Sequence, residues 1–256
     1  DTFHGLHLFI RSAFSPRHDG TGVPHAPTRR SCAAGDKAHH GLVEVGIGPG
    51  VRTVLMVEPG LDFFATTFAM LKVGAIPVMV DPGMGIKNLA ECLREAEPEA
   101  FIGVPKAQAA RVILGWGKQT IKTNVTVGRR FFWGGHTLGK LQAQAPDDPF
   151  PILQPDPEQT AAILFTSGST GVPKGVTTPF RVFTAQVKAL RKAYGIQPGE
   201  RDLATFPLFA LFGPALGMTS VVPDMDASRP ADADPARCPP WFLQGNAPYA
   251  EEIGWQ

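Results

Sequence analysis

Short apolar runs that alternate with helical segments constrain the fold of this chain more than any other feature of its sequence. The run VRTVLMV at 51–57 is almost continuously apolar and rich in β-branched residues, as expected of a strand covered on both faces. The segment 61–74 predicts a helix that ends at Gly74, and AIPVMV at 75–80 predicts a second buried strand. Similar patterns predict helices over 88–97 and 180–195 and strands over 100–104, 123–127, 161–165, 202–206 and 219–223. This alternation indicates an α/β fold with a largely parallel sheet flanked by helices.

The two ends of the chain do not share this alternation. Residues 1–40 are rich in Pro, Gly, Ser, Arg and His without any period, so we expect an irregular head. Residues 236–256 have neither a helical nor a strand period and predict a poorly ordered tail. The Pro- and Asp-rich segment 145–160 is the best candidate for an internal boundary, and the folded part is expected at 41–235.

Composition limits the classes of protein that remain. The 256 residues are 43% hydrophobic and 18% charged, a globular balance, and the net charge of +1 gives no bulk attraction to nucleic acid or an anionic membrane. No apolar run is long enough to span a bilayer, and the first residues lack the order of a signal peptide. Because the three cysteines form no CxxC and are odd in number, we expect a reduced, cytoplasmic setting.

A tract of small residues directly follows the predicted strand at 161–165. Small residues let successive backbone N–H groups converge on an anion, hydroxyls add donors, and Lys174 supplies a mobile point charge. This composition indicates a phosphate cradle, although the tract has neither Walker A spacing nor a dinucleotide fingerprint. Composition alone leaves a flexible Gly/Ser linker as the alternative. The abrupt start after a buried strand and the stiffening Pro173 count against a linker.

The segment LFTSGSTGVPKGV at 164–176 resembles the signature of the adenylate-forming (AMP-binding) superfamily, which includes acyl-CoA synthetases, peptide-synthetase adenylation domains and luciferases. KVGAIPVMVDPG at 72–83 and FPLFALFG at 206–213 are similar to two further family segments, so the resemblance covers about 41–235. Within the superfamily, the segments at 99–111 and 205–235 look most like the olefin-biosynthesis β-lactone synthetase group.

This resemblance implies that the chain forms part of the large N-terminal domain of an acyl-adenylating enzyme. In that reaction a carboxylate attacks the α-phosphorus of ATP, pyrophosphate leaves, and an acyl-adenylate forms. Thr166 and Lys174 would be the catalytic residues, acting through positioning and charge stabilisation. The β- and γ-phosphates, with Mg²⁺, would be held by Thr166, Ser167, Gly168, Ser169, Thr170, Gly171, Lys174 and Gly175.

The second aromatic motif implies an acyl pocket, in which glycines would leave room for a chain. Its lining would be Phe206, Phe209, Ala210, Phe212, Gly213 and Gly217. The alternative is that these aromatic residues are plain core. Ala210 and Phe180 stand where many family members have histidine, which bears on substrate handling more than on ATP binding.

The resemblance implies ATP-dependent activation of a long-chain β-hydroxy fatty acid that closes to a β-lactone. The alternatives are a fatty acyl-CoA ligase, which would also use coenzyme A, and a non-catalytic nucleotide- or acyl-binding remnant. The adenine-binding motif, ribose-binding Asp, hinge and lid lysine of the family do not appear in residues 236–256. We therefore expect an N-terminal fragment that is inactive alone. The resemblance also allows a complex with other olefin-biosynthesis enzymes.

Two other groups of residues give little evidence of a binding site. The histidines near the N-terminus lack partners at metal-binding spacing, so no metal-ligating residue is assigned. Arg129 and Arg130 precede Phe131, Phe132 and Trp133. One basic-aromatic patch alone is poor evidence for nucleic-acid binding, and no nucleic-acid partner is expected.

Overall fold

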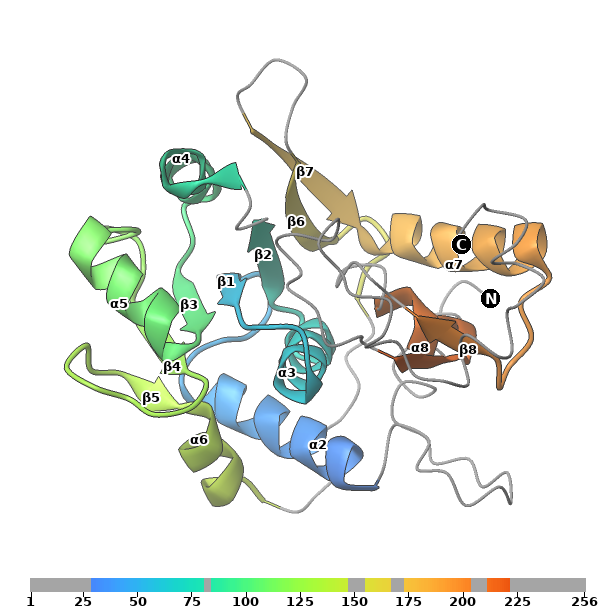
Figure 1. Ribbon diagram of the computed structural model, residues 1–256, viewed down its shortest axis with the longest axis horizontal. Coiled ribbons are helices and arrows are strands. Elements are labelled where there is room, and N and C mark those ends of the chain that lie inside the picture. Colours follow the sequence, from blue (N-terminus) through green and yellow to red (C-terminus); the bar gives the residue numbers. More distant parts are fainter. Residues whose placement is uncertain (1–28, 81–83, 147–154, 167–172, 204–210, 222–256) are drawn as a thin grey trace, which may run out of the picture.

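The computed structural model describes residues 29–80, 84–146, 155–166, 173–203 and 211–221. Within these ranges the chain forms a seven-stranded sheet with the order β5-β4-β3-β1-β2-β6-β7 (Figure 1). Neighbouring strands are parallel throughout, except that β7 runs antiparallel to β6. The strands are β1 (Arg52–Met56), β2 (Ile76–Val80), β3 (Ala100–Gly103), β4 (Thr123–Thr126), β5 (His136–Thr137), β6 (Thr160–Thr166) and β7 (Lys174–Pro179). The largely parallel sheet expected from the alternating pattern is confirmed.

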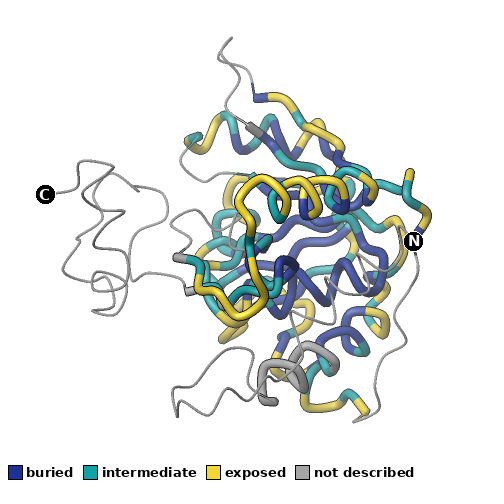
Figure 2. Tube along the Cα trace, turned by 90° about the vertical axis from the view of Figure 1, so that its right-hand side faces the viewer, coloured by how far each residue is buried: buried dark blue, intermediate teal, exposed yellow. Residues whose placement is uncertain are grey.

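Helices cover both faces of this sheet (Figure 1). One face carries α2 (Arg29–Glu44), α3 (Leu61–Lys72) and α6 (Leu138–Gln144), and the other carries α4 (Ile86–Ala96) and α5 (Pro105–Leu114). Successive strand residues point to opposite faces, so such a sheet needs apolar residues at every position. In β1, Val54 packs with the α4 side and Leu55 with the α2–α3 side, both buried. Figure 2 shows the strands as a buried layer between the helices.

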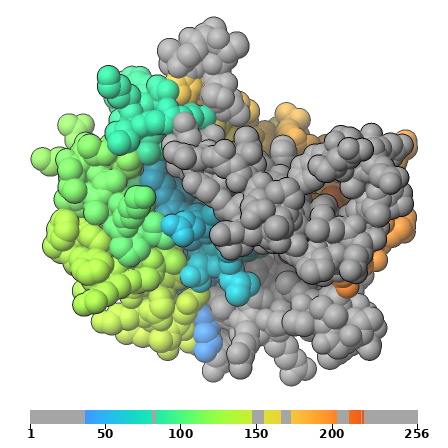
Figure 3. All heavy atoms as spheres, viewed as in Figure 1, coloured from blue at the N-terminus to red at the C-terminus, as the bar shows by residue number. Residues whose placement is uncertain are grey.

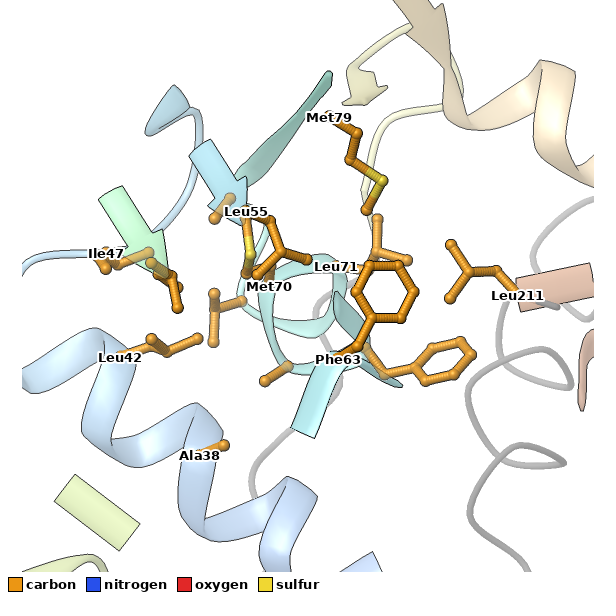
Figure 4. Close-up of a cluster of buried hydrophobic side chains, with 14 of the residues drawn as sticks. Ala38, Leu42, Ile47, Leu55, Phe63, Met70, Leu71, Met79 and Leu211 are labelled. Carbon is orange, nitrogen blue, oxygen red and sulfur yellow. The ribbon is translucent and has the colours of Figure 1, made fainter. Parts of the chain in front are cut away.

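The larger core lies between the sheet and the α2–α3 pair (Figure 4). Leu42 of α2, Leu55 of β1 and Met70 of α3 belong to this one cluster and are buried. Because side chains from three successive elements fill the same space, this core holds helix α2 against the sheet.

Helix α2 corrects the expectation of an irregular head at its C-terminal end. Residues from Arg29 onward are helical, and the buried positions in its described half are Ala38, His39, Gly41 and Leu42. A Cβ on Gly41 would lie 2.5 Å from the Cβ of Leu141 in α6, so the two helices approach closely there. A buried face made of an alanine, a histidine, a glycine and a single leucine carries almost no hydrophobic period, which is why the pattern did not reveal it. The remainder of the head and the tail at 236–256 lie outside the described residues.

The segment 145–160 does not separate two domains. It leads from α6 into β6, and β6 pairs with β2 in the same sheet, with Val78 opposite Ile163. The Pro- and Asp-rich composition marks a long connection between two strands of one sheet. The internal boundary proposed from the sequence is therefore wrong.

Besides α2, the described part of the chain contains further elements that were not expected from the sequence, namely α5, β5, α6, β7 and α8 (Phe212–Leu216). Strand β7 is an edge strand in which three of six residues are exposed and one is buried, so it lacks the apolar runs of the central strands. Helix α5 exposes Val112, Ile113 and Leu114 at its C-terminal end. Its apolar residues therefore do not all lie on the buried face, and the helical period is weak in the sequence. Both elements depend on neighbours that a local pattern does not contain.

The last described elements form a smaller unit beside β7. The expected helix is confirmed as α7 (Phe180–Tyr194), which ends at Gly195 with a φ of 63°. The expected strands appear as a parallel pair, β8 (Arg201–Leu203) and β9 (Thr219–Val221), with α8 (Phe212–Leu216) between them. Across the described ranges, no helix has both the length and the apolarity that crossing a bilayer requires.

Candidate functional site

Strands β6 and β7 fix the two ends of the glycine-rich tract. Thr166 is the last residue of β6 and Lys174 the first of β7, and they are partners in the antiparallel register. The structure therefore brings together the two residues expected to be catalytic. Ser167, Gly168, Ser169, Thr170 and Gly171, also expected to hold phosphate, lie outside the described residues.

The tract leaves the sheet at its carboxyl edge. Strand β6 runs parallel to β2, with Phe165 opposite Val80, so both strands end at the same side of the sheet. In open α/β sheets, ligands bind outside the carboxyl ends of the strands. Thr166 and Lys174 therefore lie at the edge where such a sheet accepts a ligand.

Lys174 is available to an anion. Its side chain is exposed, and no carboxylate in the described part of the chain forms an ion pair with it. A lysine carries its compact positive charge at the end of a flexible side chain. The ammonium group can therefore reach a phosphate group that does not contact the backbone. The sheet fixes the backbone of Lys174 while the ammonium group remains free to reach a ligand.

Glu95 of α4 contacts the strand that carries Lys174, and the sequence did not indicate this contact. The backbone N–H of Gly175 donates a 3.4 Å hydrogen bond to Glu95 Oε1. A Cβ on Gly175 would lie 2.9 Å from Cζ of Phe165 and 3.3 Å from the same carboxylate oxygen. Gly175 is therefore required by close packing of β7 against the Phe165 ring and α4. Since Glu95 and Gly175 are 80 residues apart, no local motif could have found the pair.

The expected acyl-pocket residues are only partly described. Phe206, Phe209 and Ala210 lie outside the described residues. Phe212 is half-buried, and its ring centroid lies 5.8 Å from that of Phe183 on α7. Phe212 is one of the partly buried residues that pack against the larger core.

The two glycines of this region also have packing or backbone reasons. Gly217 caps α8 with a φ of 84°, a left-handed conformation that favours glycine. A Cβ on Gly213 would lie 3.2 Å from Oδ2 of Asp202 and would collide with Ser220, so α8 rests directly on β8 and β9.

Burial raises the pKa of the Asp202 carboxyl above its ordinary value. Phe180, in place of a family histidine, is buried in the larger core.

Comparison with known proteins decides the family. The sequence model of the AMP-binding enzyme family matches residues 34–232. The chain belongs to the AMP-binding enzyme family. The family model begins to match at residue 34, inside the stretch 1–40 that was expected to be irregular. This start agrees with the presence of helix α2.

Two curated relatives of this AMP-binding chain bear the same name. An olefin beta-lactone synthetase of Stenotrophomonas maltophilia strain K279a is 54% identical over 210 residues, which cover 82% of this chain and 38% of the relative. The protein of that name from Xanthomonas campestris pv. campestris is 51% identical over 205 residues, covering 80% and 37%. The chain thus spans less than two-fifths of the length of these relatives.

A solved structure supports the fold. The N-terminal domain of FACL13 from Mycobacterium tuberculosis superposes with a TM-score of 0.66 at 18% identity, covering 78% of this AMP-binding chain and 51% of the other. At this identity the likeness concerns the fold alone. It confirms the expected architecture, that of the N-terminal domain of an adenylate-forming enzyme.

Proposed function

We propose that the protein carrying this chain activates a carboxylic acid by adenylation with ATP, and that this chain supplies the phosphate-holding part of the site. The observation that carries the proposal is the pairing of Thr166 with Lys174 at the carboxyl edge of the sheet. This pairing fixes both ends of a hydroxyl- and glycine-rich tract beside an exposed lysine. Such a constellation suits a polyphosphate.

The residues present fit the nucleotide. Lys174 would approach the β- and γ-phosphates, and the tract between it and Thr166 would add N–H and hydroxyl donors from Ser167, Gly168, Ser169, Thr170 and Gly171. Gly175 would keep the backbone close to α4 without adding a side chain. Bound Mg²⁺ would supply neutralisation of phosphate charge. The expected roles of Lys174 and Thr166 are positioning and electrostatic stabilisation.

We propose a long-chain β-hydroxy acid as the substrate. Both curated relatives at 51–54% identity are named olefin beta-lactone synthetases, and the likeness covers 80–82% of this chain. The acyl chain would lie along the second aromatic motif. Its proposed lining is Phe206, Phe209, Ala210, Phe212, Gly213 and Gly217.

The proposed reaction has two steps, adenylation and ring closure. The substrate carboxylate attacks the α-phosphorus of ATP, a P–O bond forms, and pyrophosphate leaves. The β-hydroxyl oxygen then attacks the activated carbonyl, its proton is released, and AMP leaves as the ring closes. The second step is intramolecular, so it benefits from a high effective concentration and needs no coenzyme A.

The deciding assay uses the protein that carries this chain with ATP, Mg²⁺ and a long-chain β-hydroxy fatty acid, without coenzyme A. We expect AMP and a β-lactone in equal amounts. The matched substrate is the same fatty acid without the β-hydroxyl, which should give no lactone. Residues 1–256 alone should give no ATP–pyrophosphate exchange.

Either of two results would indicate a different function. Turnover that begins only when coenzyme A is added would indicate a fatty acyl-CoA ligase, which shares the phosphate tract. Mg·ATP binding without any turnover by the protein that carries the chain would indicate a non-catalytic nucleotide-binding module. A complex with other enzymes of olefin biosynthesis remains part of the proposal and is tested by co-purification.

A further inference from the structure

The charges of this chain are unevenly distributed. Residues 100–146 contain seven lysines and arginines and no aspartate or glutamate. Because the whole chain has a net charge of +1, the remaining residues carry −6. A near-neutral protein therefore contains one continuous segment with a charge of +7, and this local excess is hidden in the total.

This basic segment, residues 100–146, forms one end of the molecule. It comprises β3, α5, β4, β5 and α6, and β5 is the edge strand opposite to β7. Figure 3 shows the segment as a broad surface, in green to yellow-green, at one side of the molecule. All of its cations except Arg111 are exposed, and Arg111 lies over the ring of Phe101. The positive charge is therefore presented to solvent on one side.

The loop between β4 and β5, residues 127–135, places aromatic side chains on this surface. Phe131 and Phe132 are 52% and 73% exposed, although both are large and apolar. Trp133 lies behind them, with its ring centroid 5.4 Å from that of Phe131 and 5.1 Å from that of Phe132. Neighbouring exposed apolar side chains that form a patch mark a surface that binds a protein, a membrane or a ligand.

Hydrogen bonds hold this loop in shape. Trp133 Nε1 donates a 3.0 Å bond to Oγ1 of Thr126, which is buried in β4. Arg130 donates to the carbonyl of Gly135, which closes the loop. These hydrogen bonds fix the loop backbone that carries Phe131 and Phe132. Binding through the two rings therefore costs little conformational entropy.

The other end of the sheet does not cover the loop. Figure 1 shows α7 and α8 on the far side of β6 and β7, away from α5 and β5. The loop and the cations around it thus face outward from the described fold. A partner for them must be anionic and must accept apolar side chains.

We propose that the basic segment, with Phe131 and Phe132 at its tip, docks on the surface of an anionic lipid bilayer. Aromatic side chains enter the headgroup region of a bilayer, while arginines and lysines are attracted to its negative charge. Nucleic acid fits less well, because the guanidinium of Arg129 lies 5.2 Å from the centroid of the Phe131 ring and occupies a face on which a base would stack. The docking does not depend on ATP or on the proposed reaction.

The test is sedimentation with lipid vesicles, without ATP or fatty acid. The chain should bind vesicles of phosphatidylcholine with 30% phosphatidylglycerol, bind pure phosphatidylcholine far more weakly, and dissociate in 1 M salt, where the Debye length is about 3 Å. Arg129→Ala should weaken binding about fivefold. Phe132→Ala, at a ring that is 73% exposed, should weaken it about threefold to tenfold.

Matched control variants lie on α7, at the opposite end of the sheet. Tyr194 is 75% exposed, and Lys188 is an exposed cation. Tyr194→Ala and Lys188→Ala should leave vesicle binding unchanged within twofold, and thermal unfolding should show that all variants fold. Equal binding to neutral and anionic vesicles, no vesicle binding, or losses shared by the α7 controls would overturn the proposal. Tight binding of single-stranded RNA that Phe132→Ala abolishes, with no vesicle binding, would assign the surface to nucleic acid.

Discussion

Thr166 and Lys174 are direct backbone partners across β6 and β7, although residues 167–173 lie between them in the chain. The sheet therefore sets the separation between the start of the glycine-rich tract and its lysine. A lysine held in this way needs to order only its side chain when an anion binds. This relationship connects the fold to the proposed phosphate site.

Removing the lysine should weaken nucleotide binding. A hydrogen bond to a charged group contributes about 1.5–3 kcal/mol, so Lys174→Ala should weaken Mg·ATP binding about tenfold to a hundredfold. Isothermal titration of the protein that carries this chain measures the effect. Lys188→Ala, at an exposed lysine on α7, is the matched control and should change affinity less than twofold. An unchanged affinity in Lys174→Ala would remove the proposed phosphate role.

The contact between Glu95 and Gly175 should protect the start of β7. Glu95→Ala removes the acceptor of the 3.4 Å bond, so the Gly175 amide should exchange its hydrogen several-fold faster, because a net hydrogen bond contributes about 0.5–1.5 kcal/mol. Glu95→Gln keeps an acceptor and should restore slow exchange. Glu91→Ala, on the same helix with Arg94 as its partner, is the control. Equal exchange in all three variants would show that the contact is not maintained in solution.

A side chain at Gly175 should destabilise the fold. In Gly175→Ala the new methyl group would press on the buried Phe165 ring, and overpacking of this kind costs about 1–3 kcal/mol. Phe165→Leu in the same chain should recover part of the loss, and a double-mutant cycle in urea measures this coupling. Gly48→Ala is the control, since no atom lies within 4 Å of its added Cβ. Simple additivity of the two changes would contradict the predicted contact.

The half-buried Asp202 should make stability depend on pH. Burial raises the pKa of this carboxyl, so its ionised form is disfavoured in the folded state relative to the unfolded state. Its contribution to stability is most favourable below its ordinary pKa of 3.8 and is lost as pH rises through the raised value. Asp202→Asn should therefore raise the melting temperature at pH 7, and the gain should shrink as pH falls toward 4. A gain that is constant across this range would disprove the electrostatic cause.

Cys92 should be inert in the folded protein. Its side chain points from α4 into the core between α4 and the sheet, and burial, with a smaller effect of Glu95, raises the pKa of the thiol to about 11. The thiolate is the reactive form, so iodoacetamide at pH 8 should leave Cys92 unmodified for hours and label it readily in denaturant. Peptide mass spectrometry reads this position separately from the other cysteines. Rapid labelling without denaturant would show that α4 opens locally.

The sequence by itself determined the strand–helix alternation and the family signature. Both are contiguous: VRTVLMV at 51–57 needs apolar residues at every position because both of its faces are covered, and this leaves a local pattern. The tract from Thr166 to Gly175 is likewise recognisable as a family signature, because its small hydroxylated residues and its lysine stand in a fixed order within one stretch. For such features, the chemistry and the spacing lie within one stretch of chain.

Tertiary structure decided the rest, because these features depend on partners distant in sequence. Helix α2 is recognisable only once α6 packs against Gly41, and β7 only once β6 provides the strand to which it pairs. The bond from Gly175 to Glu95 joins residues 80 positions apart, and no periodicity encodes such a distance. For charge the division is different: the acid-free segment 100–146 can be read from the sequence, and the fold decides that it forms one end of the molecule. Burial, pairing and surface potential are properties of the folded whole, which is why composition and local pattern did not contain them.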